Sequence, residues 1–556
     1  MQFDPVLLPP RRARSIAEGW WRELTINSAL DDCLAVCPDR PALAALRVES
    51  QQWRRFTYHE LAVMADRIAL GLTRLGIERN DVVAMQLPNW WQFTLLYLAC
   101  SRIGAVLNPL MPIFRERELF FMLAQTEAKV LVVPKYFRKF DYEVMARALQ
   151  ARLPALRQIV VVDGDGPDSF DALLSGPEWE RENGADAILR ATRPGPDDIT
   201  QLLYTSGTTG EPKGVMHSAN ALISNIIPYA ERMRLSENDV ILMASPLAHQ
   251  TGFMYGLMMP IFLRAQAVLQ DIWEPARGAE TIRETGATFT MASTPFMADL
   301  TRVVRESGQG VPTLRTFLSA GAPIPSALVE QAQATLGCKI ISAWGMTENG
   351  AVTTTLLDDP DERAVNTDGC PLRGTEVKVV DFDGKPLPAG QAGALLVRSS
   401  SNFGGYLKRP EWNATDADSW FDTGDLARID EQGYIRITGR SKDVIIRGGE
   451  NIPVVEVEGL LYHHRAVAQA AVVSYPDERL GERACAMVVL KPGATLEFAE
   501  MVAYLKEQKV ALPYIPERLT VLDEMPATPS GKIQKFRLRE LARAAKDSDA
   551  KKACST

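Results

Sequence analysis

Residues 56–103, FTYHELAVMADRIALGLTRLGIERNDVVAMQLPNWWQFTLLYLACSRI, switch twice between two hydrophobic periods. Apolar side chains recur at helical spacing up to Gly76, residues 81–87 are short and rich in β-formers, and residues 90–104 return to helical spacing. A further strand-like run, AKVLVV, follows at 128–133. Alternating helices and strands predict parallel strands joined by helical crossovers, which is an α/β fold.

The same alternation returns later in the chain. Residues 231–247, ERMRLSENDVILMASPL, and the strand-like run ATFTMAST at 287–294 repeat it, so we expect a second sheet of the same kind. The stretch 162–197 is rich in Gly, Pro and Asp and predicts a surface excursion. After Asp381, short strands alternate with Asp-Gly and Gln-Gly turns, which indicates hairpins.

The length of the chain sets the expected number of domains. A chain of 556 residues exceeds what one hydrophobic core normally supports, so we expect two or more domains. We place the main boundary near Arg440, in a polar stretch flanked by glycines. It separates residues 1–440 from residues 441–556, and the second part mixes strands and helices as an α+β unit.

Composition and charge narrow the class of protein. With 46% hydrophobic and 23% charged residues, the chain has the composition of a globular protein. Its 61 basic and 69 acidic residues give a net charge of -8, which argues against a general nucleic-acid binder.

The N-terminal stretch and the cysteines indicate location. The start, MQFDPVLLPPRRAR, has no apolar stretch before its basic cluster, and no run of about 18 apolar residues follows. We therefore expect a cytoplasmic protein without a transmembrane segment. The seven cysteines are scattered, and Cys33 and Cys37 form a close pair without a nearby histidine, so we expect reduced, structural thiols.

Residues 204–214, YTSGTTGEPKG, form a loop suited to phosphate. Glycines bring backbone N–H groups close to an anion, and hydroxyls and a lysine add donors. The Walker A pattern is excluded, because Lys213 follows Pro212 and precedes Gly214. A flexible polar surface loop is the alternative that the loop alone leaves open.

This loop closely resembles the phosphate loop of the AMP-forming adenylating enzymes, which include acyl-CoA synthetases, non-ribosomal adenylation domains and firefly luciferase. The resemblance extends over nearly the whole chain. It continues in order through SAWGMTE at 342–348, WFDTGDLARID at 420–430, GYIRITGRSKDVIIRGGENIPVVEVE at 433–458 and PATPSGKIQK at 526–535.

The resemblance implies a fold and a set of small-molecule partners. The expected architecture is a large N-terminal domain of layered α/β sheets with a small β-barrel-like part, followed by a small mobile C-terminal domain. The expected ligands are ATP, Mg²⁺, coenzyme A as co-substrate and a small carboxylic acid. Nucleic acid is not expected, and a homodimer stays open.

The resemblance also implies an ATP site. Trp344 takes the place of an aromatic residue, usually tyrosine, that lies against adenine. Thr347 binds phosphate, Glu348 binds Mg²⁺, and Asp425 and Arg440 contact the ribose. The positions assigned to ATP are Thr205, Ser206, Gly207, Thr208, Thr209, Gly210, Lys213, Gly321, Ala322, Pro323, Ser342, Ala343, Trp344, Gly345, Met346, Thr347, Asp425, Arg440 and Lys532.

Lys532 is the lysine expected to catalyse the first step. An ammonium that spans the carboxylate and the α-phosphate lowers their repulsion while pyrophosphate leaves. In relatives the small domain then rotates to admit coenzyme A. Lys442 matches the hinge, and Gly448 and Gly449 match the backbone that the pantetheine arm passes.

The acid is expected to lie beside His249, which resembles a gating residue. The expected acyl pocket comprises His249, Gln250, Thr251, Gly252, Phe253, Met254, Gly321, Gly345 and Gly350. The segment HQTGFMYGL carries no acidic residue for a substrate ammonium, which favours a simple acid over an amino acid. The overall sequence resembles those of medium-chain and alicyclic acyl-CoA ligases, cyclohexanecarboxylate–CoA ligase included.

Three functions stay open. The first is an acyl-CoA ligase, the second an enzyme that loads acyl groups onto a carrier protein, and the third a non-catalytic nucleotide-binding protein. The GGEN segment at 448–451 and the lack of a fused carrier domain favour the first over the second. The joint presence of Lys213, Glu348, Asp425 and Lys532 disfavours the third.

Overall fold

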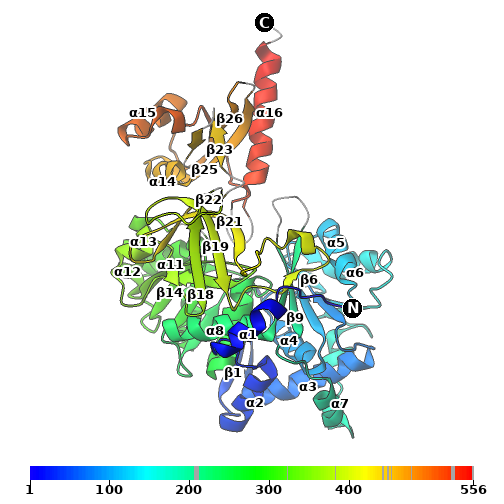
Figure 1. Ribbon diagram of the computed structural model, residues 1–556. Helices are drawn as coiled ribbons and strands as arrows, with labels where there is room; N and C mark the ends of the chain where they lie inside the picture. The colour runs from blue at the N-terminus through cyan, green and yellow to red at the C-terminus, as the bar shows by residue number, and fades with distance from the viewer. Residues whose placement is uncertain are drawn as a thin grey trace. The chain divides into compact units, whose positions relative to one another are not determined.

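The computed structural model describes residues 1–205, 212–321, 324–381, 383–440, 444–447, 450–452, 454–477, 479–527 and 533–553 (Figure 1). The chain divides into two compact units. Unit 1 is Met1–Glu376 with Val397–Phe421, and unit 2 is Val377–Leu396 with Asp422–Thr556. The boundary predicted near Arg440 adjoins residues 441–443, which lie outside the described ranges, and it stays a prediction.

Unit 1 contains the two sheets that the sequence predicts. In the described part of the chain, one sheet has nine strands and the other has seven. The first runs β17 (Cys370–Pro371), β16 (Gly350–Thr354), β15 (Lys339–Met346), β14 (Thr316–Ala320), β13 (Phe289–Ala292), β11 (Val240–Met243), β12 (Gln266–Gln270), β1 (Pro41–Arg47) and β2 (Gln52–Thr57). The second runs β20 (Gly405–Tyr406), β10 (Lys213–Ser218), β9 (Ile199–Thr205), β4 (Val106–Pro109), β3 (Val82–Met85), β5 (Val130–Pro134) and β8 (Gln158–Val162).

The central strands of both sheets are parallel, which confirms the crossover prediction. In the nine-stranded sheet, β1, β12, β11, β13, β14 and β15 pair in parallel. In the seven-stranded sheet, β9, β4, β3, β5 and β8 do so. Antiparallel strands occur at the edges, and a small hairpin of β6 (Tyr136–Phe137) and β7 (Phe140–Asp141) stands apart.

Helices precede and connect these strands. They are α1 (Pro9–Ala17), α2 (Ile26–Val36), α3 (Tyr58–Arg74), α4 (Trp91–Ile103), α5 (Glu116–Thr126), α6 (Tyr142–Gln150), α7 (Ala185–Thr192), α8 (Ala219–Arg232), α9 (Met259–Leu263), α10 (Pro275–Thr285), α11 (Thr294–Ser307), α12 (Ser326–Leu336) and α13 (Glu362–Asn366). Short π-helical and 3₁₀ turns are η1 (Asp171–Ser175), η2 (Trp179–Arg181), η3 (Gly252–Met258) and η4 (Pro410–Trp412).

The two helices predicted within residues 56–104 form where the local sequence provides their ends. Thr57 and Glu60 make a reciprocal capping box at the start of α3. Gly104 ends α4 with φ 68°, a left-handed conformation that glycine adopts without a steric penalty. The two helices pack side by side (Figure 1).

Alternation along the strands of the nine-stranded sheet directs their side chains into two different cores of unit 1. Ile241 and Met243 belong to the large core that also contains Val83 of the seven-stranded sheet. Leu242 and Val268 belong to a second core formed with α10, α11 and α12. The sheet is therefore buried on both faces, as expected for parallel strands.

The stretch 162–197, predicted as a surface excursion, is mostly exposed or half-buried, and it contains a helix, α7, that the sequence did not predict. Its Gly, Pro and Asp residues obscure a helical run in which Ala185 and Leu189, one turn apart, are both buried. The apolar face of α7 is short, so the polar composition of the stretch hid the helical spacing of its apolar residues.

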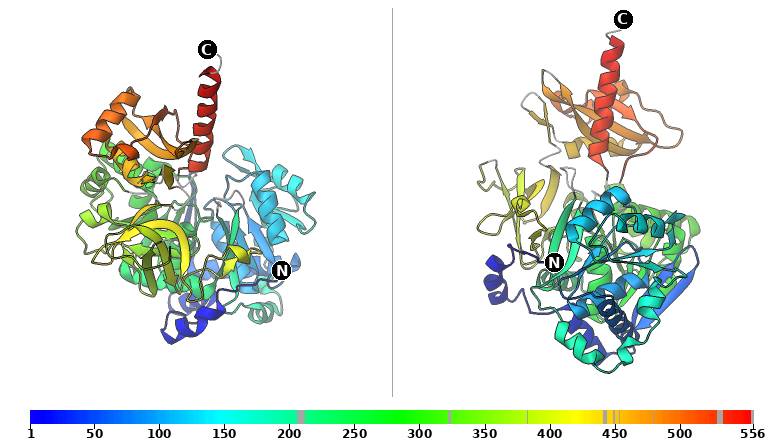
Figure 2. Two further views of the ribbon diagram at one scale, coloured as in Figure 1. Left: turned by 45° about the horizontal axis from the view of Figure 1, so that its top comes forward. Right: turned by 90° about the vertical axis from the view of Figure 1, so that its right-hand side faces the viewer.

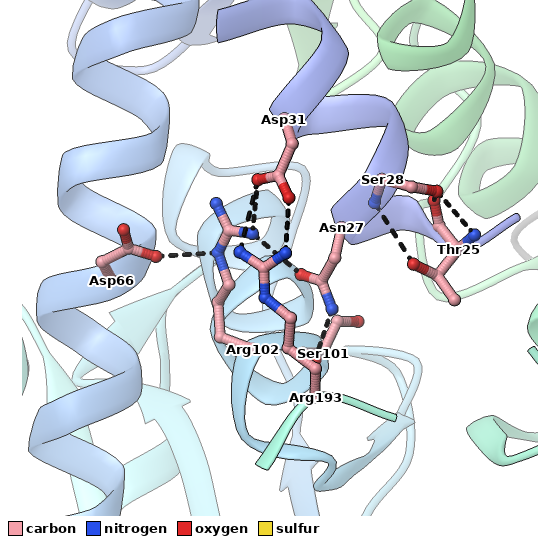
Figure 3. Close-up of polar contacts among 8 residues, drawn as sticks. All are labelled: Thr25, Asn27, Ser28, Asp31, Asp66, Ser101, Arg102 and Arg193. Atoms are coloured by element: carbon pink, nitrogen blue, oxygen red, sulfur yellow. Dashed lines mark hydrogen bonds and ion pairs between the residues drawn. The ribbon is translucent and has the colours of Figure 1, made fainter. Parts of the chain in front are cut away.

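Three helices of unit 1 meet at a buried guanidinium (Figure 3). Arg102 of α4 donates from Nε to Asp66 Oδ1 of α3 at 2.7 Å, and from Nη1 to Asp31 Oδ1 and Asn27 Oδ1 of α2 at 3.1 and 3.2 Å. Arg193 also contacts Asp31. Burial raises the pKa of Asp66, and the Arg102 charge opposes that rise. The two carboxylates thus supply counter-charges to the buried guanidinium of Arg102.

Unit 2 contains two further sheets. Most residues of a four-stranded sheet fall here, in the order β18 (Thr375–Val380), β19 (Gly393–Ser399), β21 (Phe421–Ile429) and β22 (Ile435–Arg440). The β21–β22 hairpin turns at Gly433, which has φ 83°, and confirms the predicted Gln-Gly turn.

The second sheet of unit 2 has five strands in the described residues. They are β24 (Glu450–Ile452), β23 (Ile445–Arg447), β26 (Gly481–Leu490), β25 (Val467–Asp477) and β27 (Arg518–Val521), with α14 (Val454–His463), α15 (Phe498–Glu507), η6 (Leu512–Tyr514) and α16 (Lys535–Ala553). The terminal helix α16 packs against β25 (Figures 1 and 2). Within the described ranges, no helix combines the length and the apolar character needed to cross a membrane.

A buried histidine links the two sheets of unit 1. His217 on β10 is 1% exposed, and its Nε2 lies 2.7 Å from the carbonyl oxygen of Thr347, just after β15. Because a carbonyl only accepts, Nε2 carries the proton. Burial lowers the pKa of His217 to about 4, so the folded chain holds the ring neutral near pH 7.

The lowered pKa of His217 makes the free energy of unfolding depend on pH. Below about pH 6.5 the unfolded chain binds a proton at His217 that the folded chain excludes until about pH 4. The free energy of unfolding should therefore decrease as the pH is lowered from about 6.5 to about 4, and His217 should account for a loss on the order of 3 kcal/mol. The change His217→Gln, which keeps a donor for Thr347, should remove most of that loss, measured as urea unfolding at about pH 7.5 and about pH 4.5.

The matched control is His463→Gln on α14, an exposed histidine whose ring bonds the carbonyl of Gly459. It should leave the pH dependence as in the wild type. An acid loss that is equally large in His217→Gln would contradict the account.

Candidate functional site

Part of the predicted site lies outside the described residues. These positions are Ser206, Gly207, Thr208, Thr209, Gly210, Ala322, Pro323, Lys442, Gly448, Gly449 and Lys532. Their assignments stay predictions. The remaining positions fall on both units.

The phosphate loop begins and ends at one point of the seven-stranded sheet. Thr205 ends β9 and Lys213 begins β10, and these two residues are direct partners in the antiparallel ladder. A strand therefore flanks the loop on each side. The ladder holds Lys213 at the exit of the loop.

Aromatic rings surround Lys213. Its Nζ lies 4.6 Å from the ring centroid of Tyr406 and 5.3 Å from that of Trp412. β20 pairs with β10 through Val215 and Tyr406, and this pairing places the ring beside the lysine. An ammonium over aromatic faces is stabilised electrostatically.

The predicted nucleotide segments meet at the carboxyl ends of two parallel strands. β14 and β15 are neighbours, with Ser319 opposite Ser342 and Ala320 opposite Ala343. Gly321 follows β14, is exposed and has φ 90°, a conformation that favours glycine. Open α/β sheets bind ligands beyond the carboxyl ends of their strands. The geometry therefore fits a ligand site at this edge of unit 1.

The turn from β15 to β16 requires glycine at two positions. A Cβ on Gly345 would lie 2.1 Å from the carbonyl oxygen of Gly350, and Gly350 itself has φ 71°. Around this turn Trp344 and Thr347 are half-buried, so both retain exposed surface. These are the positions predicted for adenine and phosphate.

Glu348, the next residue, is buried. It is 6% exposed, and Tyr406 donates its hydroxyl hydrogen to Oε1 at 2.7 Å. Phe403 N–H donates to the backbone oxygen of Glu348, also at 2.7 Å. Burial and the charge of Glu348 raise the pKa of Tyr406, so the phenol stays protonated and donates.

This carboxylate fits the predicted metal. Mg²⁺ prefers oxygen ligands and is usually bound by one or two carboxylates together with phosphates and water. Among the described residues, no group of three or more His, Cys, Asp or Glu side chains forms a metal cluster. Glu348 would be one ligand of the metal, with the nucleotide and water contributing further oxygen ligands.

The N-terminal helix holds the segment that precedes Tyr406. The guanidinium of Arg11 on α1 donates to the carbonyls of Ser399, Asn402 and Phe403 at 3.3, 2.6 and 2.9 Å. Burial lowers the pKa of Arg11 to about 9. Sequence reasoning missed Arg11 and Tyr406, because neither stands in a recognised motif.

Some of the predicted acyl-pocket residues lie together. A Cβ on Gly350 would lie 3.0 Å from Met254 Sδ and 3.1 Å from Asn225 Oδ1. Asn225 Nδ2 also donates to the carbonyl of Ala351 at 2.7 Å, and Tyr255 donates to Asn225 Oδ1 at 2.6 Å. Met254 and Gly350 therefore adjoin, in a packed environment beside the β15–β16 turn.

The other predicted pocket residues differ in burial. Phe253 is fully buried and packs edge-on against Tyr97, with ring centroids 4.6 Å apart. Gln250 is 3% exposed, and its Oε1 accepts from Gln201 Nε2 at 3.1 Å.

The turn that precedes this segment completes the predicted set. His249 is exposed, Thr251 is half-buried and its N–H lies 3.4 Å from His249 Nδ1. Gly252 is buried, and a Cβ there would lie 2.2 Å from the oxygen of Pro246. Of the predicted set, His249 is thus the side chain that solvent reaches most readily.

In unit 2, the two residues predicted for the ribose form an ion pair. Asp425 on β21 and Arg440 on β22 are direct partners in the ladder, and Arg440 Nε lies 3.0 Å from Asp425 Oδ1. Asp425 is 5% exposed. The pairing orients the carboxylate.

Comparisons with known proteins cover most of the chain. The profile of the AMP-binding enzyme family matches residues 30–407, and that of the AMP-binding enzyme C-terminal domain matches residues 456–532. The chain is 39% identical to the medium-chain fatty-acid–CoA ligase of Escherichia coli K12, over 95% of this chain and 92% of that protein. It is 34% identical to the salicyl-AMP ligase / salicyl-S-ArCP synthetase of Mycobacterium tuberculosis, over 95% and 93%.

Solved structures agree. The anthranilate CoA ligase AuaEII in complex with anthranoyl-AMP has a TM-score of 0.81 at 26% identity, covering 94% of this chain and 98% of that one. ATP-bound MatB from Rhodopseudomonas palustris has a TM-score of 0.80 at 28% identity, covering 93% and 99%. These similarities confirm the predicted fold class and the resemblance drawn from the motifs. The chain belongs to the AMP-binding enzyme family and is an ATP-dependent, AMP-forming acid–thiol ligase.

Proposed function

We propose that the protein converts a medium-sized carboxylic acid to its coenzyme A thioester through an acyl-adenylate. The acid is alicyclic, such as cyclohexanecarboxylate, or a medium-chain fatty acid. The observation that carries this proposal is the segment Gly252–Met258, which is buried throughout, has no charged side chain and places Met254 against Gly350 at the turn that holds Glu348. The name of the Escherichia coli relative agrees with it.

In the proposed first step, a carboxylate oxygen of the acid attacks the α-phosphorus of ATP. A new P–O bond forms, the bond to the β-phosphate breaks, and pyrophosphate leaves with the electron pair. Lys213 and the loop bind the departing phosphates, and Lys532 lowers the repulsion between the two reacting anions. Glu348 would hold Mg²⁺, and the metal would supply positive charge beside the phosphates.

In the proposed second step, the thiol of coenzyme A attacks the acyl carbon and AMP leaves. The ribose of the adenylate is bound by Asp425 and Arg440, and Trp344 lies against the adenine. We propose that residues 441–556 move between the steps about Lys442, so that Gly448 and Gly449 replace Lys532 beside the adenylate. A cytoplasmic location stays a prediction, and a homodimer stays open.

Transfer to a carrier protein is the second candidate. It is favoured by the Mycobacterium tuberculosis relative, whose name includes an S-ArCP synthetase activity. The chemistry before the thiol is the same in both candidates. The identity of the accepting thiol therefore distinguishes them.

The proposed function is tested by measuring pyrophosphate release with benzoate, cyclohexanecarboxylate and linear fatty acids of increasing length, with and without coenzyme A. We expect turnover that depends on coenzyme A, and a preference of about tenfold or more for the alicyclic or medium-chain acids over benzoate, because pocket shape is worth about 1–3 kcal/mol. Turnover that only a pantetheinylated carrier protein supports would overturn the proposal in favour of the second candidate.

The two half-reactions should be separable by mutation. Lys532→Ala should slow acid-dependent pyrophosphate release by about 10²–10³-fold, because it removes a transition-state charge contact, while preformed acyl-adenylate is still consumed with coenzyme A. Lys442→Pro should do the reverse, sparing pyrophosphate release and slowing thioester formation. Each half-reaction is followed in single-turnover assays.

The control for Lys532→Ala is Lys535→Ala, which removes a nearby lysine whose Nζ lies 2.6 Å from Glu458 Oε1. It should leave adenylation at the wild-type rate. Normal adenylation by Lys532→Ala would refute the role of Lys532, and an equal loss of both half-reactions in Lys442→Pro would refute the hinge.

A further inference from the structure

Tyr406 lies between the two charged groups of unit 1 that the proposed reaction uses. Its hydroxyl donates to Glu348 Oε1 at 2.7 Å, and its ring centroid lies 4.6 Å from Lys213 Nζ. One side chain therefore contacts both the proposed metal ligand and the phosphate-binding lysine. The family motifs that indicated the site assign no role to this residue.

The position of Tyr406 is fixed from several directions. Its backbone N–H donates to Asn413 Oδ1 at 2.9 Å, and its strand pairs with β10. Its ring packs against Phe403 with centroids 4.7 Å apart, and Arg11 holds the carbonyl of Phe403 at 2.9 Å. Because Tyr406 is only 5% exposed, its hydroxyl has little freedom to leave Glu348.

The contact constrains the carboxylate. A hydrogen bond to Oε1 fixes the plane of the Glu348 carboxylate and therefore the direction of its second oxygen. Among the described residues, the hydrogen bond to the Glu348 carboxylate comes from Tyr406 and is accepted by Oε1. Groups that hydrogen-bond a metal-ligating side chain orient it and tune its affinity for the metal.

We propose that Tyr406 is a positioning residue for adenylation. Its hydroxyl orients the Glu348 carboxylate toward Mg²⁺, and its ring sets the place of Lys213. The inference rests on the proposed function, in which Glu348 holds the metal and Lys213 binds the departing phosphates. Because Tyr406 acts through Glu348, its effect appears in metal affinity before any chemical step.

The test is metal binding without turnover. Tyr406→Phe keeps the ring, and with it the contact to Lys213, but removes the hydroxyl. Mn²⁺ is titrated by electron paramagnetic resonance into the full-length protein saturated with a non-hydrolysable ATP analogue, with no acid present. We expect the affinity for Mn²⁺ to fall by about tenfold, since loss of a group that orients a ligand typically costs about 10–100-fold.

Tyr142→Phe is the matched control. Tyr142 is also buried, and it donates its hydroxyl hydrogen to the carbonyl of Pro112 at 2.8 Å. This variant loses a comparable hydrogen bond outside the site, so its Mn²⁺ affinity should equal that of the wild type. Thermal unfolding of both variants shows whether each one is folded.

A double-mutant cycle with Glu348→Gln shows whether Tyr406 acts through Glu348. We expect Tyr406→Phe to have no further effect on Mn²⁺ affinity in the Glu348→Gln background. An undiminished effect there, or no effect of Tyr406→Phe alone while Glu348→Gln weakens binding, overturns the positioning role only. If neither variant changes the affinity, the metal role of Glu348 in the proposed function is overturned together with it.

Discussion

A buried carboxylate, that of Glu348, is the constraint around which the site in unit 1 is arranged. Removing a charge from water costs several kcal/mol unless hydrogen bonds or a counter-charge compensate for it. The protein supplies a phenol donor from Tyr406 and holds the backbone of Glu348 through Phe403. The segment that carries these two residues is in turn fixed by Arg11 of the first helix.

The same segment connects the metal ligand to the phosphate loop. Because β20 pairs with β10, Tyr406 is placed beside Lys213 by sheet geometry, independently of its contact with Glu348. His217, on the same strand as Lys213, donates to the carbonyl of Thr347. Strand β10 therefore positions Lys213 directly and contacts, through His217, the turn that carries Glu348. Charges of opposite sign thus lie at defined positions before any ligand binds.

This preorganisation has a chemical purpose in the proposed reaction. Attack of one anion on another is slow because their charges repel, and catalysis requires positive charge to be in place when the reaction begins. Groups that must first reorient would lose part of that advantage. In the proposed reaction Glu348 would hold Mg²⁺, which supplies positive charge. The fold fixes the orientation of the Glu348 carboxylate through hydrogen bonds, so this metal ligand does not have to reorient.

Much of the fold could be predicted from sequence because its signals are local. Helix α3 has a capping box and regular apolar spacing, and α4 ends at Gly104, so both were predicted within a few residues. Helix α7 was missed because its buried face comprises only Ala185 and Leu189, within a polar stretch. Short amphipathic segments carry too little periodicity to outweigh composition.

The site was predicted only in part, for a related reason. Lys213 and Glu348 stand in motifs that resemble those of a known family, whereas Tyr406 and Arg11 act through contacts between residues 58 and 392 positions apart. Such contacts depend on how strands pair, and no local pattern records them. The pairing of Asp425 with Arg440 was likewise set by strand register, although both residues were predicted.

The central claim is that an acyl-adenylate forms before coenzyme A reacts, and exchange of labelled pyrophosphate into ATP tests it most directly. The account predicts that the acid supports this exchange in the absence of coenzyme A, and that no exchange occurs without the acid. Exchange that requires coenzyme A, or that proceeds without any acid, would contradict it.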